Sequence, residues 1–219
     1  MKILYKDEDI IVCVKPYGML SQSDNKGNIS AVDVLSEMTK LNIYPVHRLD
    51  KTTGGVMVFA LSSASASKLS SQITDGRFKK EYLAVVSGKV EREEDELCDL
   101  LYFDRVKNKS YIVKRKRAGV KEARLKYKLI ESKKIKEREY SLLKIRLFTG
   151  RTHQIRVQFA NRGMWLSGDK RYGAKDDFKN IALWSESLSF NHPITNQPLY
   201  FKEMPQGEIF EYFNIKITE

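Results

Sequence analysis

The chain has 219 residues, of which 39 are lysine or arginine and 28 are aspartate or glutamate, so its formal net charge is +11. This length is enough to bury a substantial core, and no segment approaches the roughly 20 apolar residues that a membrane span needs. The excess of basic residues favours an anionic partner, such as nucleic acid, the ribosome or an acidic lipid surface.

Two strands and a helix are predicted in the first part of the chain. Residues 2–14 read as two short strands around a polar turn at 6–9, because apolar residues flank that turn. Ser30 is a typical N-cap, and apolar residues follow it at helical spacing. The helical positions are Val34, Leu35 and Met38.

The next segment places charged residues directly before an apolar, partly β-branched run. The run at 56–61 predicts a buried strand, and the glycine pair at 54–55 allows a sharp turn or a close approach of the backbone. Arg48, Asp50 and Lys51 would then lie in a loop at the mouth of that strand. Flanking cations favour an ionised Asp50, which could act as a nucleophile, a base or a metal ligand.

Strands outnumber helices in the rest of the chain. A helix around Leu69 is expected to end near Gly76, and a last helix over 152–162 to end at Gly163. Further strands are predicted at 82–86, 123–131, 140–150, 187–191 and 198–202. Residues 91–98 are expected to form an acidic connection. The pattern predicts an α+β fold with an extended, mixed but mostly antiparallel sheet.

Basic residues are concentrated in one segment. Between Arg105 and Arg146 there are about 17 lysines and arginines against about 4 acidic residues, so the rest of the chain is slightly acidic. This concentration favours a polyanion-binding surface, with Lys114, Arg115, Lys116 and Arg117 as its densest part. The alternative is a set of solvated strand faces and turns.

The sequence predicts no metal site and a cytoplasmic location. Cys13 and Cys98 lie among apolar residues without the spacing of a metal site, so we expect reduced, buried thiols. The first residues include acidic side chains and lack the apolar core of a secretory signal. The histidines, His47, His153 and His192, are not spaced for a shared ion.

Several motifs in the expected order resemble the RluA/RsuA-like family of pseudouridine synthases. The segment HRLDKTTGGVMVFA at 47–60 resembles the family's catalytic motif. The other matching segments are KPYGML at 15–20, KKEYLAVVSGKV at 79–90, and TGRTHQIRVQFANRG with GDKRYG within 149–173. Ordered motifs spread over most of a chain are more specific than any one of them.

The resemblance implies an RNA pseudouridine synthase, which isomerises uridine in structured ribosomal or transfer RNA. It implies a sheet in two lobes with a central cleft. We expect residues 1–219 to form a single catalytic domain without an appended RNA-binding domain, and a monomer that binds RNA and no membrane. The reaction breaks the N1–C1′ bond and rejoins uracil through C5, so it needs neither cofactor nor metal, and the sequence contains no motif for either.

The resemblance also implies roles for individual residues. Asp50 would be the catalytic nucleophile, Tyr82 would stack on the uracil, and Arg151 would pair with Asp50 through its guanidinium. Arg156 competes with Arg151 for that role or faces phosphate. The residues expected to bind RNA are Arg48, Lys51, His153, Gln154, Arg156, Lys114, Arg115, Lys116 and Arg117.

Two other functions fit parts of the sequence. A non-catalytic RNA-binding or ribosome-assembly protein could keep the fold, although the intact set of Asp50, Tyr82 and Arg151 argues against it. A metal-dependent nuclease would need clustered carboxylates beside Asp50, and no motif supplies them. The chain departs from the family pattern at Gln158 and at Met164-Trp165, where histidine and His-Pro are usual. These departures bear on which RNA substrate is recognised and not on the class of reaction.

Overall fold

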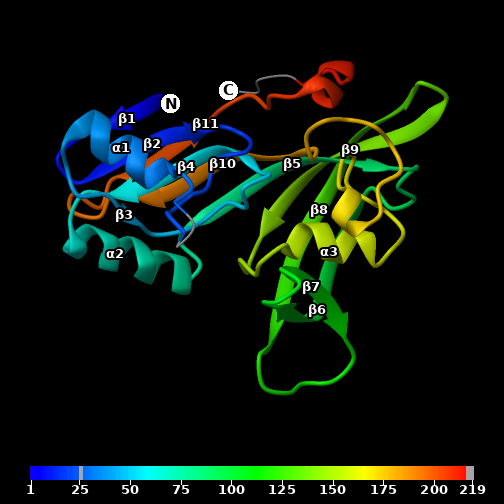
Figure 1. Ribbon diagram of the computed structural model, residues 1–219, viewed down its shortest axis with the longest axis horizontal. Coiled ribbons are helices and arrows are strands. Elements are labelled where there is room, and N and C mark those ends of the chain that lie inside the picture. The colour runs from blue at the N-terminus through cyan, green and yellow to red at the C-terminus, as the bar shows by residue number, and fades with distance from the viewer. Residues whose placement is uncertain (25–26, 216–219) are drawn as a thin grey trace. The chain divides into compact units, whose positions relative to one another are not determined.

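The computed structural model describes residues 1–24 and 27–215 (Figure 1). The chain divides into two compact units, which we call unit 1 (Met1–Glu81 with Trp184–Pro205) and unit 2 (Tyr82–Leu183 with the described part of Gln206–Glu219). Both contain mostly antiparallel strands with few helices, which confirms the predicted α+β class. No helix within the described ranges is long and apolar enough to cross a bilayer.

Unit 1 is built around strand β4. Its elements are β1 (Lys2–Lys6), β2 (Ile10–Lys15), α1 (Ala31–Thr39), β3 (Tyr44–Pro45), β4 (Gly54–Ala60), α2 (Ser63–Thr74), β10 (Leu183–Asn191) and β11 (Pro198–Lys202). The strand order is β1-β2-β4-β10, with β11 beside β10 and β3 beside β4. β4 runs antiparallel to β2 and parallel to β10. The strand following the charged segment is therefore central, as predicted.

The glycine pair at the start of β4 allows β10 to approach closely. A Cβ on Gly54 would lie 2.5 Å from the ring of Trp184. Gly55 has φ +119°, and a Cβ there would lie 2.2 Å from the backbone oxygen of Ser185. All seven residues of β4 are buried. The start of β4, and the loop before it, are thus held against β10 by contacts that no larger residue permits.

The first helix of unit 1 begins where the sequence predicts. Ser30 caps α1, accepting a hydrogen bond from the Asp33 backbone N–H, while the Asp33 carboxylate accepts one from the Ser30 backbone. Leu35 is buried in α1, but Met38, also expected to face inward, is 53% exposed. Leu69 of α2 packs into a core with residues of β2, β4 and β10. α1 therefore buries a narrower stripe than its apolar residues suggest, whereas Ala66 and Ile73 of α2 pack against the core beside Leu69.

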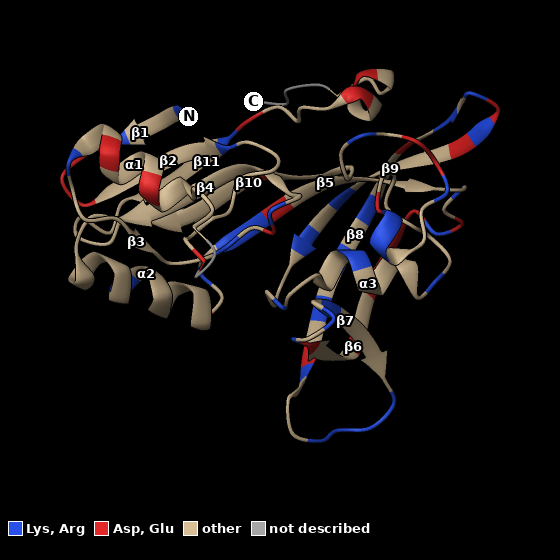
Figure 2. Ribbon diagram, viewed as in Figure 1, with Lys and Arg blue, Asp and Glu red and all other residues tan. Residues whose placement is uncertain are grey.

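Unit 2 is an antiparallel sheet covered on one face by a short helix. Its elements are β5 (Lys79–Ser87, from Tyr82 on), β6 (Glu94–Asp104), β7 (Lys109–Val113), β8 (Val120–Ile135), β9 (Arg138–Leu147), α3 (Gln154–Ala160), η1 (Lys170–Tyr172) and η2 (Glu208–Tyr212). The strand order is β5-β9-β8-β6-β7. Phe159 of α3 packs against Tyr127 of β8, with ring centroids 5.4 Å apart. The opposite face of β8 carries exposed charged residues (Figure 2).

The expectation of an acidic connection at 91–98 is wrong, because β6 begins at Glu94. Glu94 forms an ion pair with Lys126 at 2.6 Å, and Glu96 pairs with Arg124. These carboxylates lie on the solvent face of β6 and are matched by cations of the neighbouring strand. Cys98 lies on the same face and is exposed, so only Cys13 has the buried thiol that was expected.

Candidate active site

Asp50 lies in the loop that enters β4. The side chain of Asp50 is half-buried, while Arg48 and Lys51 beside it are exposed. The Thr53 backbone N–H donates to the Asp50 carbonyl oxygen at 2.9 Å, which closes a turn just before the strand. The predicted loop with flanking cations at the strand's mouth is therefore present.

The segment at 15–21 fixes the backbone of this loop. The Gly18 N–H donates to the Lys51 carbonyl at 2.8 Å. The Ser21 hydroxyl donates to the Leu49 carbonyl at 2.8 Å and accepts from the Leu49 N–H at 2.9 Å. Both neighbours of Asp50 are thus held by hydrogen bonds, and its carboxylate is presented from a rigid turn.

Lys15 places a buried ammonium group near Asp50. Its side chain is 0% exposed, and Nζ donates to the carbonyls of Pro16 at 3.0 Å and Met19 at 2.7 Å. Burial lowers the pKa of Lys15 to about 8, and the negative charge of Asp50 partly offsets that fall. The sequence motifs gave no role to Lys15. A lysine at the end of an otherwise apolar strand was the signal that could have identified it.

His47 supports the strand rather than the chemistry. Its Nε2 accepts a hydrogen bond from the Val58 N–H at 3.2 Å, and its ring packs against Phe78 at 5.5 Å. Burial lowers the pKa of His47 to about 3, and the nearby charge of Lys80 acts in the same direction. The imidazole is therefore neutral and acts as a backbone acceptor.

Tyr82 and Arg151 belong to unit 2, whereas Asp50 belongs to unit 1. Tyr82 is buried in β5, with 5% of its surface exposed. Arg151 is half-buried, and its Nε donates to the Glu122 carbonyl at 2.8 Å. That Asp50, Tyr82 and Arg151 meet in one active site stays a prediction.

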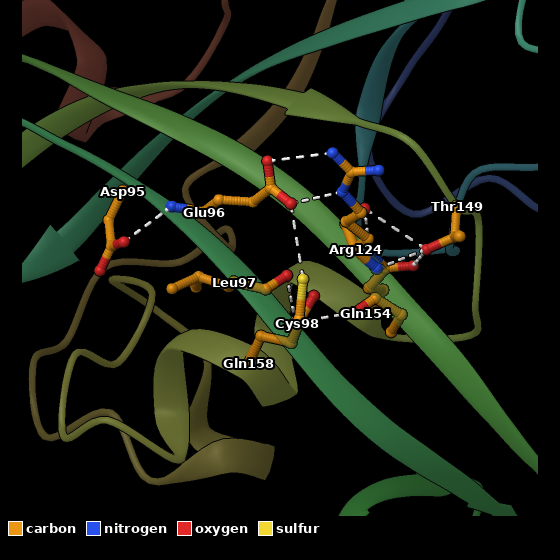
Figure 3. A network of polar contacts seen from close by, with 9 residues as sticks. Asp95, Glu96, Leu97, Cys98, Arg124, Thr149, Gln154 and Gln158 are labelled. Atoms are coloured by element: carbon orange, nitrogen blue, oxygen red, sulfur yellow. Dashed lines mark hydrogen bonds and ion pairs between the residues drawn. The ribbon is translucent and has the colours of Figure 1, made fainter.

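Gln154 hydrogen-bonds to Thr149 and Arg124 (Figure 3), and it also fixes the loop that carries Arg151. Its side-chain oxygen accepts from the Arg151 N–H at 3.1 Å and from the Thr149 hydroxyl at 2.8 Å, and its Nε2 donates to the Arg124 carbonyl at 3.1 Å. Gln154 is only 3% exposed. Its position favours a structural role over the RNA contact expected of it.

Arg151 also lines a pocket within unit 2. The pocket has a volume of about 670 Å³, and its lining includes three basic residues, one acidic residue and two aromatic residues, namely Arg105, Lys121, Arg151, Asp104, Tyr102 and Phe103. This volume is in the range of small-ligand sites. A basic pocket with aromatic walls is suited to a nucleotide or a phosphate.

Two residues expected to face RNA are buried instead. Arg156 is 3% exposed and forms a bidentate ion pair with Asp169, with Nε to Oδ2 at 2.6 Å. His153 is 8% exposed, and its Nδ1 lies 3.0 Å from the Tyr172 hydroxyl. Their burial favours a structural role for both side chains, and RNA binding by Arg156 and His153 stays a prediction.

The segment at 114–117 does lie on the surface. All four residues are exposed in the loop between β7 and β8 (Figure 2). Lys116 pairs with Glu122 at 2.7 Å, and the Arg117 guanidinium lies 5.1 Å from the Tyr102 ring centroid. The loop is therefore accessible to solvent, and polyanion binding by it stays a prediction.

One group in the described ranges brings metal-ligating atoms together. Atoms of Asp7, Asp9 and His192 lie within 4.8 Å of one another. The Nδ1 of His192 accepts from the backbone N–H groups of residues 194 and 195, so its Nε2 carries the proton that points to Asp7 at 2.9 Å. Asp9 accepts from Ser65 at 2.9 Å. Hydrogen bonds therefore explain this group without a metal ion.

A model of the family described as RNA pseudouridylate synthase matches residues 9–161. The chain belongs to this family. The synthase is an isomerase acting on RNA, as the resemblance implied. The match includes the Asp50 loop, Tyr82 and Arg151.

Relatives of the synthase carry related names. "Dual-specificity RNA pseudouridine synthase RluA" of Haemophilus influenzae is 32% identical over 92% of this chain and 91% of its own. "Ribosomal large subunit pseudouridine synthase C" of Buchnera aphidicola is 30% identical over 97% of this chain and 70% of its own. "tRNA pseudouridine synthase C" of Haemophilus ducreyi is 30% identical over 91% and 88%. The solved structure "Human RNA Pseudouridylate Synthase Domain Containing 1" superposes with a TM-score of 0.78 over 93% of this chain and 83% of its own. At 20% sequence identity, this shows a similar fold.

Proposed function

We propose that the synthase converts uridine to pseudouridine in ribosomal or transfer RNA with Asp50 as the nucleophile. The placement of Asp50 carries this proposal. Its carboxylate is half-buried, stands in a loop held by hydrogen bonds on both sides, and lies near the buried ammonium group of Lys15. A carboxylate held in this way can attack the nucleoside without first reorganising its surroundings.

Two residues of unit 2 complete the proposed chemistry. Arg151 would orient the Asp50 carboxylate through its guanidinium, and Gln154 holds the Arg151 backbone for that task. Tyr82 would stack on the uracil while the glycosidic bond breaks and the base turns to present C5. The base must leave its stack to reach Asp50, so the RNA would be bound with the target nucleotide flipped out.

RNA recognition would use the exposed cations. Arg48 and Lys51 flank Asp50, and residues 114–117 form a basic loop in unit 2. The relatives are named for ribosomal RNA, transfer RNA or dual specificity, so both RNA classes belong to the proposal. We further propose a monomer that works in the cytoplasm, in agreement with the two free cysteines.

Pseudouridine-specific chemical mapping of total RNA tests the proposal. RNA from cells lacking the gene would be incubated with the purified wild-type protein, with Asp50→Asn, or with the control Asp75→Asn, which changes an exposed aspartate after α2. We expect new pseudouridines with the wild type and the control and none with Asp50→Asn, while RNA affinity stays within about twofold, because the amide keeps the shape but cannot attack. Substantial turnover by Asp50→Asn would refute the role of Asp50. An RNA-binding protein without catalysis would yield no pseudouridine in any arm.

A further inference from the structure

We infer that Phe148, with Arg124 and Arg146, binds an unpaired base of the RNA on the face of the unit 2 sheet opposite α3. The inference rests on the proposed function in one respect, namely that the partner is RNA. It adds a site for a base other than the target uridine. The site lies on β8 and at the end of β9, and it is made by residues of unit 2 alone.

Phe148 is an exposed aromatic ring between two guanidinium groups. It follows β9 directly, and 41% of its surface is exposed. The guanidinium carbon of Arg124 lies 4.6 Å from the ring centroid, and that of Arg146 lies 5.5 Å away. Aromatic rings and guanidinium planes are the two side-chain surfaces on which unpaired RNA bases stack.

The two arginines are held differently. Arg124 forms an ion pair with both carboxylate oxygens of Glu96 (Figure 3). Its backbone oxygen accepts hydrogen bonds from the Phe148 N–H and from Gln154 Nε2. Arg146 is exposed and, among the residues described, has no carboxylate partner. Arg124 therefore stays beside the ring. Arg146 can move from the ring to a phosphate and leave its place to a base.

Lysines extend the row of cations along β8 and β9, away from the ring. In the register of β8 and β9, Lys126 lies opposite Arg146 and Lys128 lies opposite Lys144. Arg124, Lys126 and Lys128 alternate with buried residues and so share the exposed face of β8. A strand whose base stacks on Phe148 would place its flanking phosphates over these cations.

This arrangement fits RNA better than a protein or a lipid surface. The apolar part is a single ring, smaller than the patches that mark protein or membrane interfaces. Glu94 and Glu96 neutralise Lys126 and Arg124, so Arg146 and Lys128, for which the described residues supply no ion pair, are the cations that would meet the phosphates. The surface thus offers one stacking position within a row of cations, which matches an unpaired nucleotide and its phosphates.

A pair of oligomers tests the inference by separating stacking from charge. The probes are a short fluorescent oligouridylate and an abasic oligomer with the same number of phosphates. We expect the wild type to bind the oligouridylate more tightly. Phe148→Ala should lose roughly fivefold or more in affinity for the oligouridylate, the lower end of what one stacked base contributes, and should bind the abasic oligomer as before.

Three further variants complete the test. Phe148→Trp keeps a stacking surface and should keep the preference for the base-containing oligomer. Tyr200→Ala removes an aromatic ring that is 57% exposed on β11, and it should change neither affinity. Arg146→Gln should weaken binding of both oligomers and reduce the salt dependence by about 0.7 in log–log slope for each phosphate that the protein no longer neutralises.

The outcomes separate this inference from the proposed function. A wild type without preference for bases, or a Phe148→Ala variant that retains the preference, would overturn the stacking site. Equal reductions in affinity for both oligomers would also overturn it, because Phe148 would then act through the fold of its loop. Pseudouridine mapping with the wild type is a separate measurement. If it finds no new pseudouridine while the wild type still prefers the base-containing oligomer, only the proposed function is contradicted.

Discussion

Arg156 and Asp169 form a bidentate ion pair in which both side chains are almost completely buried, at 2.6 Å and 2.8 Å. Arg151, five residues earlier in the same motif, is instead half-buried and lines a pocket. The two arginines therefore have different environments. Arg156 supports the packing of α3, and Arg151 is the one placed where it can contact a ligand.

Arg156→Met should therefore lower the stability of the fold, whereas Arg151→Met should lower the reaction rate. Removing Arg156 leaves the Asp169 carboxylate buried without its partner, so we expect a loss of roughly 3–5 kcal/mol in the free energy of unfolding. Arg151→Met should change stability little. It should lower the single-turnover rate at saturating RNA by roughly 100-fold or more, because the catalytic carboxylate would lose its charge partner. Urea denaturation and single-turnover assays measure the two effects. A stable Arg156→Met variant would contradict the structural role.

Lys15 should give the activity an alkaline limit. Above its pKa of about 8 the buried ammonium loses its proton, and Asp50 loses the positive charge near it. We expect the single-turnover rate to fall as the pH rises through this value. Lys15→Arg keeps the charge across this range and should move the limit to higher pH. A wild-type rate that stays constant well above the pKa of Lys15 would show that its charge does not assist Asp50.

His47 should make the fold sensitive to acid. Its pKa is lowered from 6.5 to about 3 in the folded protein, so the unfolded chain binds a proton that the folded chain excludes. The stability contributed by neutral His47 is therefore complete above pH 6.5 and is lost as the pH falls toward 3, by at most about 1.4 kcal/mol per pH unit. His47→Gln retains an acceptor for the Val58 N–H and should flatten this dependence. Denaturation at several pH values measures the slope, and equal slopes would contradict the assignment.

The basic loop at 114–117 should contribute to RNA affinity through charge alone. Reversing Lys114, Arg115, Lys116 and Arg117 to glutamate should raise the Michaelis constant and make the log–log salt dependence of binding shallower. Single-turnover chemistry at saturating RNA should change little, because the loop positions the substrate without touching the reacting bond.

A variant with the same change in net charge provides the control. It reverses the exposed lysines Lys6, Lys68, Lys79 and Lys89, which lie outside the basic segment. This variant should keep the wild-type salt slope. Equal effects of the two variants would mean that overall charge, rather than the loop, attracts the RNA.

The sequence predicts most strands because local patterns carry that information. The apolar run of β4 and the alternation in β8 and β9 are visible without knowledge of their neighbours. β6 was missed because its acidic residues become compatible with a strand only when Arg124 and Lys126 lie beside them, about 30 residues along the chain. A non-local partner leaves no local signal.

The candidate site was predictable to the same degree. The position of Asp50 in a loop before a buried strand follows from sequence pattern alone. The support that Lys15 and Ser21 give to Asp50 cannot be predicted from that pattern, because it depends on a turn that brings residues 15–21 against the Asp50 loop. Motif spacing likewise cannot tell that Arg156 turns toward Asp169 while Arg151 does not.

The division of unit 1 into two distant chain segments has a consequence for biosynthesis. Gly54 and Gly55 pack against Trp184 and Ser185, which leave the ribosome about 130 residues later. Until then β4 lacks its parallel neighbour, and its apolar surface stays open to chaperones or to other nascent chains. The continuous stretch 82–183 of unit 2 can fold meanwhile. We expect the Asp50 loop to reach its final form only after Trp184 and Ser185 have been synthesised.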